Sequence, residues 1–311
     1  MEDGHVLVVG SAGIDVKGIY NSGDLEWGTS NLGTIRNTVG GVARNIAENL
    51  ARLELETILL TAVGDDIQGK RIIEECENTG INCDHILEVE DSRTGTYMAL
   101  LKPDGQLHVA ISDFEITSYI DSDYLLDHED LFKDALMIVI DATLSEDTLE
   151  TVFDIAIRYK IKVCADPTTP ALASRLCPHL SHLYLVVPNA SETSAMCGPA
   201  QEPTDRDSAI ATAREFVSKG AGIAVVTLGK QGLAYADRGG SGFIQAVNTE
   251  IIDTTGAGDA FSGAAIFGLL NGVPVDEAMR LGITAASLTI ESRHTVFPEL
   301  SQDLLYEKLS I

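Results

Sequence analysis

The sequence predicts an α/β fold with a doubly wound, mainly parallel sheet flanked by helices and a small β-sheet that acts as a lid. Three observations predict it. Short apolar runs recur along the chain, and segments with helical periodicity lie between them. This alternation is typical of parallel β-α-β units. Two longer insertions interrupt the alternation near the N-terminus, and these predict the lid.

The strands and helices of the main sheet follow in order. Short runs rich in Val, Ile and Leu predict strands that are buried on both faces. These runs are Val6–Gly10, Thr57–Val63, Leu136–Asp141, Lys162–Ala165, Leu183–Val187 and Gly222–Thr227. Apolar residues at helical spacing predict helices over Ala43–Leu53, Thr148–Tyr159, Ser208–Lys219, Ala260–Leu270 and Val275–Thr289. Glycine-rich Ala236–Gly242 predicts a hairpin in the C-terminal half.

The two insertions predict a discontinuous lid. Asp15–Thr38 is too long and too polar for a simple strand-to-helix connection. Thr94–Ile111 alternates polar and apolar residues about the turn Lys102–Gly105, so we expect a hairpin with Met98, Leu100, Leu107, Val109 and Ile111 on one face. We expect one domain over residues 1–311, with a lid from residues 15–38 and 94–115 beyond the carboxyl ends of the main strands.

Charge and cysteine content restrict the partners and the compartment. The chain has 47 Asp and Glu against 21 Lys and Arg, a formal charge of −26, which disfavours nucleic acid and anionic membranes as partners. Five cysteines, an odd number without C-x-x-C spacing, predict neither a disulfide framework nor a zinc site. No apolar run approaches ~18 residues and the start lacks signal-peptide features, so we expect a cytoplasmic protein without a membrane span.

The segment Asp253–Asp259, Asp-Thr-Thr-Gly-Ala-Gly-Asp, is the most informative motif. Two glycines let the backbone turn sharply ahead of an apolar helix, and the helix N-terminus favours an anion such as a phosphate. Asp259 stands at the mouth of this site, where a carboxylate can accept a proton from an attacking hydroxyl. The alternative is a helix start with an acidic cap.

Two N-terminal segments predict a sugar-binding site. In Gly40–Asn45 a glycine pair permits close approach to a ligand, and the Asn45 amide can both donate to and accept from hydroxyls. A Gly-Gly turn with a solvated Asn is an equally good interpretation. Asp15 follows the first strand, where one carboxylate can accept hydrogen bonds from two vicinal hydroxyls, although such an Asp by itself is more often a turn former.

Three other patterns do not carry a function. Gly64–Lys70 has the spacing of a P-loop, but Arg71 stands where Ser or Thr would bind magnesium, and the loop carries two aspartates. His179 and His182 have no third ligand nearby in the sequence, which favours a surface pair. The first strand is followed by Gly10-x-x-Gly13, not the dinucleotide-binding fingerprint, which argues against an oxidoreductase.

Together these segments resemble the ribokinase-like family, also called the PfkB carbohydrate kinases. Gly40–Asn45, Val63–Gly69 and Asp253–Asp259 occur in that family's order and spacing, and the resemblance covers essentially the whole chain. It implies a ribokinase-like fold and transfer of the ATP γ-phosphoryl group to a primary hydroxyl. Within the family, four segments are most similar to the subgroup that phosphorylates the ribosyl 5′-hydroxyl of pseudouridine: Gly10–Gly18, Ser30–Gly33, Gly40–Ala51 and Val109–Asp113.

The resemblance also implies a role for each motif residue. Asp259 would be the catalytic base, and Gly256, Ala257 and Gly258 would supply amides of the anion hole. The ribose would be held by Asp15, Gly40, Gly41 and Asn45. Mg²⁺ would be organised by Asn189 and by Glu192 through waters. ATP would contact Thr227, Gly229, Gly232 and Ser287, with adenine between Val247–Ile252 and the helix around Ala285–Leu288. Asp253 and Thr255 match positions for a monovalent cation, but Ser292–His294 departs from the family pattern and leaves potassium dependence open.

Recognition of the base is assigned to the lid. Ser30, Asn31, Thr96 and Asp113 are polar candidates to contact a uracil-like ring, and Asp113 could read the extra N–H of pseudouridine. Ribose or another nucleoside such as adenosine is the alternative acceptor. A catalytically silent nucleoside-binding protein is a further alternative, against which Asp259, Asn189 and Glu192 argue. The exposed lid also offers an edge for a homodimer.

Overall fold

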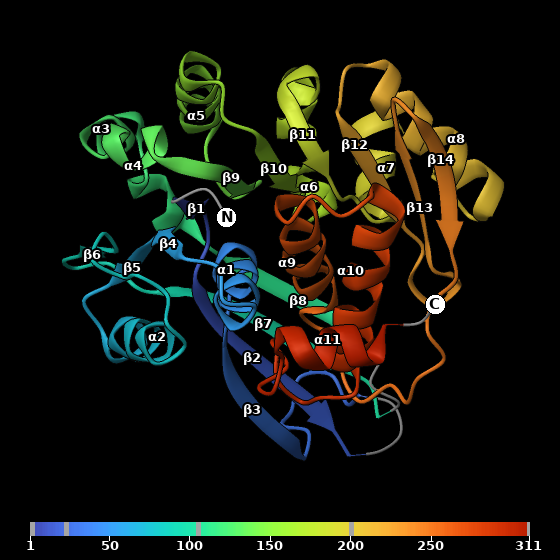
Figure 1. Ribbon diagram of the computed structural model, residues 1–311. Helices are drawn as coiled ribbons and strands as arrows, with labels where there is room; N and C mark the ends of the chain where they lie inside the picture. Colours follow the sequence, from blue (N-terminus) through green and yellow to red (C-terminus); the bar gives the residue numbers. More distant parts are fainter. Residues whose placement is uncertain (1–3, 22–24, 104–106, 199–201, 310–311) are drawn as a thin grey trace.

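A computed structural model describes residues 4–21, 25–103, 107–198 and 202–309. Its main sheet has the strand order β14-β13-β12-β11-β10-β9-β1-β4 (Figure 1). Strands β12, β11, β10, β9, β1 and β4 are parallel to one another, and β13 and β14 form the predicted antiparallel hairpin at one edge. The strands are β1 (His5–Val9), β4 (Thr57–Leu60), β9 (Ala135–Asp141), β10 (Val163–Asp166), β11 (Leu183–Val186), β12 (Ile223–Thr227), β13 (Leu233–Asp237) and β14 (Gly240–Ile244).

Helices cover both faces of the main sheet, because alternate residues of its strands pack into two separate apolar clusters. The cluster on one face includes α1 (Val42–Arg52), α2 (Ile67–Asn78), α9 (Ala257–Leu270), α10 (Val275–Ile290) and α11 (Gln302–Lys308). The cluster on the other face includes α3 (Ser122–Asp127), α4 (Glu129–Lys133), α5 (Glu146–Tyr159), α6 (Pro170–Ala173), α7 (Ala190–Cys197) and α8 (Arg206–Ser218). Three 3₁₀ segments in the described part of the chain lie between these elements: η1 (Glu115–Tyr119), η2 (Ser174–His182) and η4 (Gly229–Gln231).

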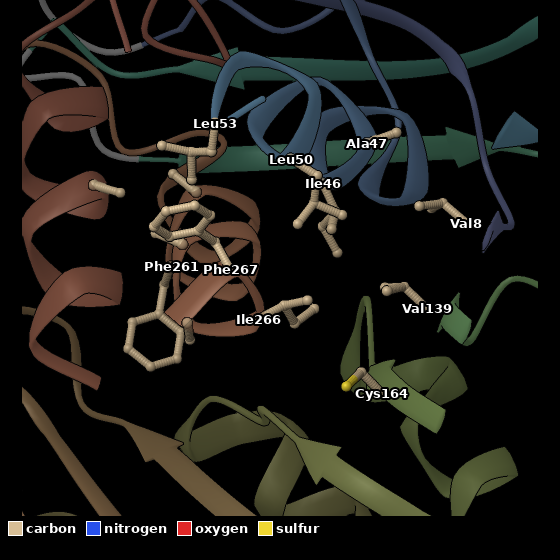
Figure 2. Packing of buried hydrophobic residues seen from close by; sticks show 14 of the residues in the cluster. Val8, Ile46, Ala47, Leu50, Leu53, Val139, Cys164, Phe261, Ile266 and Phe267 are labelled. Atoms are coloured by element: carbon tan, nitrogen blue, oxygen red, sulfur yellow. The ribbon is translucent and has the colours of Figure 1, made fainter. Parts of the chain in front are cut away.

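Helices α1 and α9 pack against each other above the sheet. Figure 2 shows Ile46 and Leu50 of α1 close to Ile266 of α9. Gly263 permits a close crossing of the two helices, since a Cβ at this position would lie 2.6 Å from the Cβ of Asn49. One helical turn earlier on each helix stand two residues of the predicted site, Asn45 and Asp259, and the crossing brings them together.

The two insertions pair to form a second sheet of four strands, here called the small sheet, in the order β3-β2-β7-β8. Its strands are β2 (Gly13–Tyr20), β3 (Gly33–Gly40), β7 (Gly95–Leu101) and β8 (Leu107–Asp113). Within the small sheet, Thr38, Asp15, Tyr97 and Ser112 lie opposite one another on adjacent strands. Residues 104 and 105 of the predicted turn, and residues 22–24 of the first insertion, lie outside the described residues.

The structure corrects one predicted strand and adjusts several element ends. The predicted strand Thr57–Val63 is two strands, because the chain leaves the main sheet after β4, and β5 (Ala62–Gly64) pairs with β6 (Leu87–Val89) instead. A continuous apolar run does not mark such a change of partner. Helix α5 begins earlier than predicted, since Ser145 caps it by accepting a hydrogen bond from the Thr148 amide. A polar first turn has no apolar periodicity to show it.

Two expectations about composition can be compared with the structure. Among the described helices, none is both long and apolar enough to cross a bilayer. The five cysteines all lie in described segments and all are free thiols.

The outer face of the small sheet exposes Met98, Val109 and Ile111, and Ile111 is 69% exposed. The homodimer stays a prediction, and a monomer in analytical ultracentrifugation would contradict it.

Candidate active site

A cavity of about 910 Å³ lies at the carboxyl ends of β1, β9, β10, β11 and β12 and is bounded on its other side by the small sheet. A cavity of this size accommodates a small-molecule ligand. The position is the one expected for a ligand in a doubly wound sheet. Among the residues predicted from the sequence, Asp15, Gly41, Asn45, Asn189, Glu192, Thr227, Thr255, Gly256, Gly258 and Asp259 line it.

The N-terminus of α9 forms one wall of the cavity. Gly256 caps the helix in the left-handed conformation, and a Cβ there would lie 1.8 Å from the Thr295 carbonyl oxygen, so only glycine fits. Within the described part of the chain, the amides of Gly258 and Asp259 have no hydrogen-bond acceptor. Free amides at a helix N-terminus bind anions, which makes this wall suitable for a phosphoryl group.

Asp259 is part of the same wall and lines the cavity, and its side chain is 8% exposed. Burial raises the pKa of its carboxyl to about 7, against an opposing hydrogen bond from Asn45. That bond runs from Asn45 Nδ2 to Asp259 Oδ2 and measures 2.7 Å. The nearby carboxylates of Asp15, Asp141 and Glu192 also raise the pKa. A base that titrates near neutral pH can both accept and release a proton there.

Asp15 lies in the cavity on the small-sheet side and is 5% exposed. Burial raises the pKa of its carboxyl to about 6, with the charge of Lys17 acting in the opposite direction. Gly40 is needed beside it, since a Cβ at Gly40 would lie 2.4 Å from Asp15 Oδ1. Within the described residues, no donor hydrogen-bonds this carboxylate. Asp15 can therefore accept hydrogen bonds from two hydroxyls of a ligand.

A third wall carries more carboxylates. Asn189 and Glu192 form a capping box at the start of α7, in which Glu192 Oε2 accepts from the Asn189 amide at 2.8 Å. Burial raises the pKa of Glu192. Burial, Glu192 and Asp259 raise the pKa of Asp166, which also lines the cavity. Among the described residues, no group of three or more His, Cys, Asp or Glu is placed to hold a metal without other ligands.

The predicted monovalent-cation position already carries a positive charge. Lys17 Nζ on β2 lies 2.7 Å from Asp253 Oδ2, and the Thr255 amide donates to Asp253 Oδ1 at 2.9 Å. Burial alone would raise the pKa of Asp253, but the hydrogen bonds from Lys17 and Thr255 outweigh it and hold the pKa below its ordinary value. Each oxygen of Asp253 thus has one partner from the protein, and the Lys17 ammonium places a positive charge at this position.

The lid residues predicted to contact a base lie away from the cavity. Thr96 and Asp113 face each other across β7 and β8, but neighbouring residues of a strand point to opposite faces. Tyr97 and Ser112 therefore line the cavity instead. Asn31 accepts from the Glu26 amide at 2.9 Å and lines a smaller hollow on the outer face of the small sheet. Ser30 is exposed in the same loop and does not line the cavity.

The remaining predicted residues lie outside the cavity lining. Gly40 and Ala257 flank residues that line it. Gly232 ends the turn after β12, where its carbonyl accepts from the Leu228 amide at 2.8 Å, and Gly229 opens that turn with φ 54°. Ser287 Oγ donates to the Thr284 carbonyl within α10. The amides of Ile252 and Asp253 donate to the Ile290 carbonyl, which places the predicted adenine segment beside the end of α10.

Sequence reasoning missed Asp141, which joins three parts of the site. Its Oδ2 accepts from the Ser11 amide at 2.8 Å, from Ser11 Oγ at 2.6 Å and from the Ala43 amide at 3.1 Å. It thereby ties the end of β1 to the start of α1. The signal was available, since Asp141 ends a predicted strand. Asp141 itself does not line the cavity; the cavity-lining residues that were missed include Tyr97, Ser112, Phe114, Thr143, Asp166 and Arg175.

Comparisons with known proteins agree with this geometry. The profile of the pfkB family carbohydrate kinases matches residues 3–302. Pseudouridine kinase of Escherichia coli is 33% identical over 301 residues, which cover 96% of this chain and 95% of that protein. Guanosine-inosine kinase of Exiguobacterium acetylicum is 29% identical and covers 95% of this chain and 97% of its own. The structure of Arabidopsis thaliana ribokinase with ribose and ATP superposes with a TM-score of 0.85 at 22% identity, covering 99% of each chain.

Proposed function

The chain belongs to the pfkB family of carbohydrate kinases, and from this premise we propose that it transfers the γ-phosphoryl group of ATP to the 5′-hydroxyl of pseudouridine. The family fixes a phosphotransferase that acts on a sugar or nucleoside. The similarity to E. coli pseudouridine kinase over nearly the full length of both chains supports the finer assignment. One observation carries the reaction: buried Asp259 stands at the N-terminus of α9 beside amides that have no acceptor among the described residues, in a cavity that also holds Asp15.

The proposed chemical step uses few groups. Asp259 accepts the proton of the 5′-hydroxyl as the O5′–P bond forms and the bond between the γ-phosphorus and the bridging oxygen of ADP breaks. The amides of Gly258 and Asp259 hold the oxygens of the phosphoryl group in transfer. Phosphoryl transfer depends mainly on positioning and charge neutralisation, so one base and a helix N-terminus are sufficient protein groups.

The residues also fit ATP with Mg²⁺. When bound, Mg²⁺ neutralises phosphate charge, and this acidic cavity has little positive charge of its own. Glu192 uses only Oε2 in its capping box, so Oε1 is available for a water of the metal. Arg175 lines the cavity, but its Nη1 donates to the backbone carbonyls of Ala142, Thr143 and Leu144. ATP and ribose in the Arabidopsis ribokinase structure support the same pair of ligand sites here.

The acceptor would lie against one row of side chains on the small sheet. This row faces the cavity and includes Asp15, Tyr97 and Ser112. We assign the ribose hydroxyls to Asp15 and to Asn45, whose amide has a second N–H besides the one bonded to Asp259. Tyr97 and Ser112 lie next along the same row and line the cavity, which supports assigning the contacts with the base to them. Ribose and purine nucleosides are the alternative acceptors, since guanosine-inosine kinase is also a full-length relative.

A panel of acceptors tests the proposal. Purified protein with ATP and Mg²⁺ would be given pseudouridine, uridine, inosine, adenosine and ribose, with ADP release followed by a coupled assay. We expect the highest kcat/KM for pseudouridine and a 5′-phosphate product by ³¹P NMR. Turnover of ribose or a purine nucleoside without turnover of pseudouridine would overturn the substrate assignment and leave the kinase assignment standing.

A further inference from the structure

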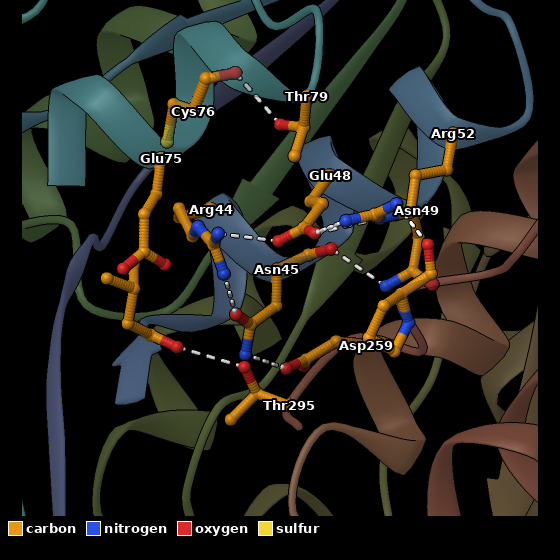
Figure 3. A network of polar contacts seen from close by, with 12 residues as sticks. Arg44, Asn45, Glu48, Asn49, Arg52, Glu75, Cys76, Thr79, Asp259 and Thr295 are labelled. Carbon is orange, nitrogen blue, oxygen red and sulfur yellow. Dashed lines mark hydrogen bonds and ion pairs between the residues drawn. The ribbon is translucent and has the colours of Figure 1, made fainter. Parts of the chain in front are cut away.

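Two oppositely charged side chains of α1 are buried next to the candidate active site. Arg44 is 3% exposed and Glu48 is 5% exposed, and Arg44 Nη2 lies 2.5 Å from Glu48 Oε2 (Figure 3). Arg52 completes the group at the outer end, with Nη2 2.6 Å from Glu48 Oε1. Burial of ions costs several kcal/mol each, and apolar residues of similar volume often replace such a pair without loss of stability. Stability alone therefore does not account for the pair, and its contacts with the site are the next evidence.

The inner end of this network reaches Asp259 through Asn45. Arg44 Nη1 donates to Asn45 Oδ1 at 3.1 Å, and Asn45 Nδ2 donates to Asp259 Oδ2 at 2.7 Å. Arginine has only donors, so the amide atom that faces Arg44 must be the oxygen. The nitrogen of the amide is then directed at Asp259, and Figure 3 shows the three side chains in this sequence.

We propose that Arg44 is a positioning residue for phosphoryl transfer, which fixes the direction of the hydrogen bond between Asn45 and Asp259 so that the amide always donates. This inference rests on the proposed function, in which Asp259 is the base. Glu48 holds the Arg44 guanidinium in place, and Arg52 in turn neutralises the second oxygen of Glu48. Without Arg44, the Asn45 amide is free to rotate and to present its oxygen to Asp259. Only a protonated carboxyl bonds to that oxygen.

The consequence concerns the ionised form of Asp259. Carboxylates of Asp15 on β2, Asp141 on β9, Asp166 on β10 and Glu192 on α7 surround Asp259, and each disfavours its negative charge. The Asn45 amide on α1 is the side-chain donor that opposes them. Loss of this donor raises the pKa of Asp259 further, so the base is ionised only at higher pH.

The experiment removes the Arg44 guanidinium, which donates to Asn45, without leaving Glu48 as an unpaired buried charge. Arg44→Met with Glu48→Gln deletes both buried ions, and the introduced amide still accepts from Arg52. Arg52→Met is the matched control, because it removes an arginine from the outer end of the same network but leaves the Arg44–Glu48 ion pair and the hydrogen bond from Arg44 to Asn45. A second variant, Arg44→Leu with Glu48→Leu, guards against failure of the first to fold. The readouts are the pH profile of kcat/KM for the best acceptor of the panel and the ¹³C NMR titration of carboxyl-labelled Asp259, assigned by comparison with Asp259→Asn.

We expect either folded double variant to move the acid limb of the profile and the Asp259 titration upward by about one pH unit. This corresponds to a loss of roughly tenfold in kcat/KM at pH 6 that is recovered near pH 9. Arg52→Met should stay within about twofold of the wild-type profile. A folded double variant with the wild-type profile and titration overturns the role of Arg44. Activity in Asp259→Asn would instead refute the base assignment, and the NMR titration would still decide how Arg44 acts.

Discussion

At the scale of single residues, the site depends on which face of a strand a side chain occupies. Asp15, Tyr97 and Ser112 lie opposite one another and line the cavity, whereas Thr96 and Asp113 belong to the alternate face. The hypothesis that Asp113 reads the base is therefore one residue out of register with the cavity. The side chains next to it in sequence, Ser112 and Phe114, are the ones at the cavity.

Substitutions in this row should change substrate preference. We expect Tyr97→Phe and Ser112→Ala each to reduce the preference for pseudouridine over uridine by roughly tenfold, the effect of one lost hydrogen bond in a buried site. Asp113→Ala is the matched control and should leave the preference unchanged within about twofold. The ratio of kcat/KM for the two nucleosides is the measurement. A large effect of Asp113→Ala with none in the row would restore Asp113 as the base-reading residue.

At the scale of elements, one ion pair joins the small sheet to the loop that precedes α9. Lys17 comes from β2, and Asp253 stands two residues before Thr255, which lines the cavity. The pair therefore connects the small sheet, which also carries Asp15, to the segment that leads into the N-terminus of α9. The pair also provides a fixed positive charge where the family resemblance suggested a monovalent cation.

We predict that catalysis does not require potassium. Replacement of KCl by choline chloride at constant ionic strength should leave wild-type kcat/KM unchanged within about twofold. Lys17→Met should lower kcat/KM by roughly tenfold or more, because it leaves the Asp253 carboxylate without an opposite charge, and added K⁺ should restore part of the activity. Strong activation of the wild type by K⁺, with no gain of K⁺ response in the variant, would contradict this.

At the scale of the whole molecule, the burial of carboxyl groups in the cavity makes the stability of the protein depend on pH. Burial raises the pKa of Asp15 to about 6 and that of Asp259 to about 7, so these carboxyls bind protons more tightly in the folded state than in the unfolded chain. Their contribution to stability is fully present below the unfolded value near 4 and is lost as pH rises through the folded values. The formal charge of −26 acts in the same direction.

Thermal unfolding should show this directly. We expect the Tm of the unliganded protein to fall between pH 5 and pH 7.5, and Asp259→Asn, which mimics the protonated form, to raise Tm at pH 7.5 by roughly 2–6 °C. The same variant should lose activity by several orders of magnitude, so that stability and catalysis change in opposite directions. Differential scanning calorimetry at matched ionic strength is the measurement. A Tm that rises with pH over this interval, or falls in the variant, would refute the interpretation.

Much of the fold and part of the site follow from local patterns. The parallel strands, the helices between them and the β13–β14 hairpin were predictable because each depends on a short apolar period or a turn signal. The strand Thr57–Val63 was predicted wrongly because both of its halves are apolar and only pairing separates them. Asp15, Asn45 and Asp259 were found because glycines and strand ends mark them, whereas Tyr97 and Arg44 have no such mark.

The sequence by itself determined the alternation of strands and helices, the acidic surface and the two glycine-rich motifs, since these are properties of neighbouring residues. Only the tertiary structure decided which of two adjacent side chains faces the cavity, that Lys17 pairs with Asp253, and that Arg44 reaches Asp259 through Asn45. Lys17 and Asp253 are 236 positions apart, and Asn45 and Asp259 are 214 apart. Register and helix crossing bring such groups together, and neither leaves a periodic trace in the chain.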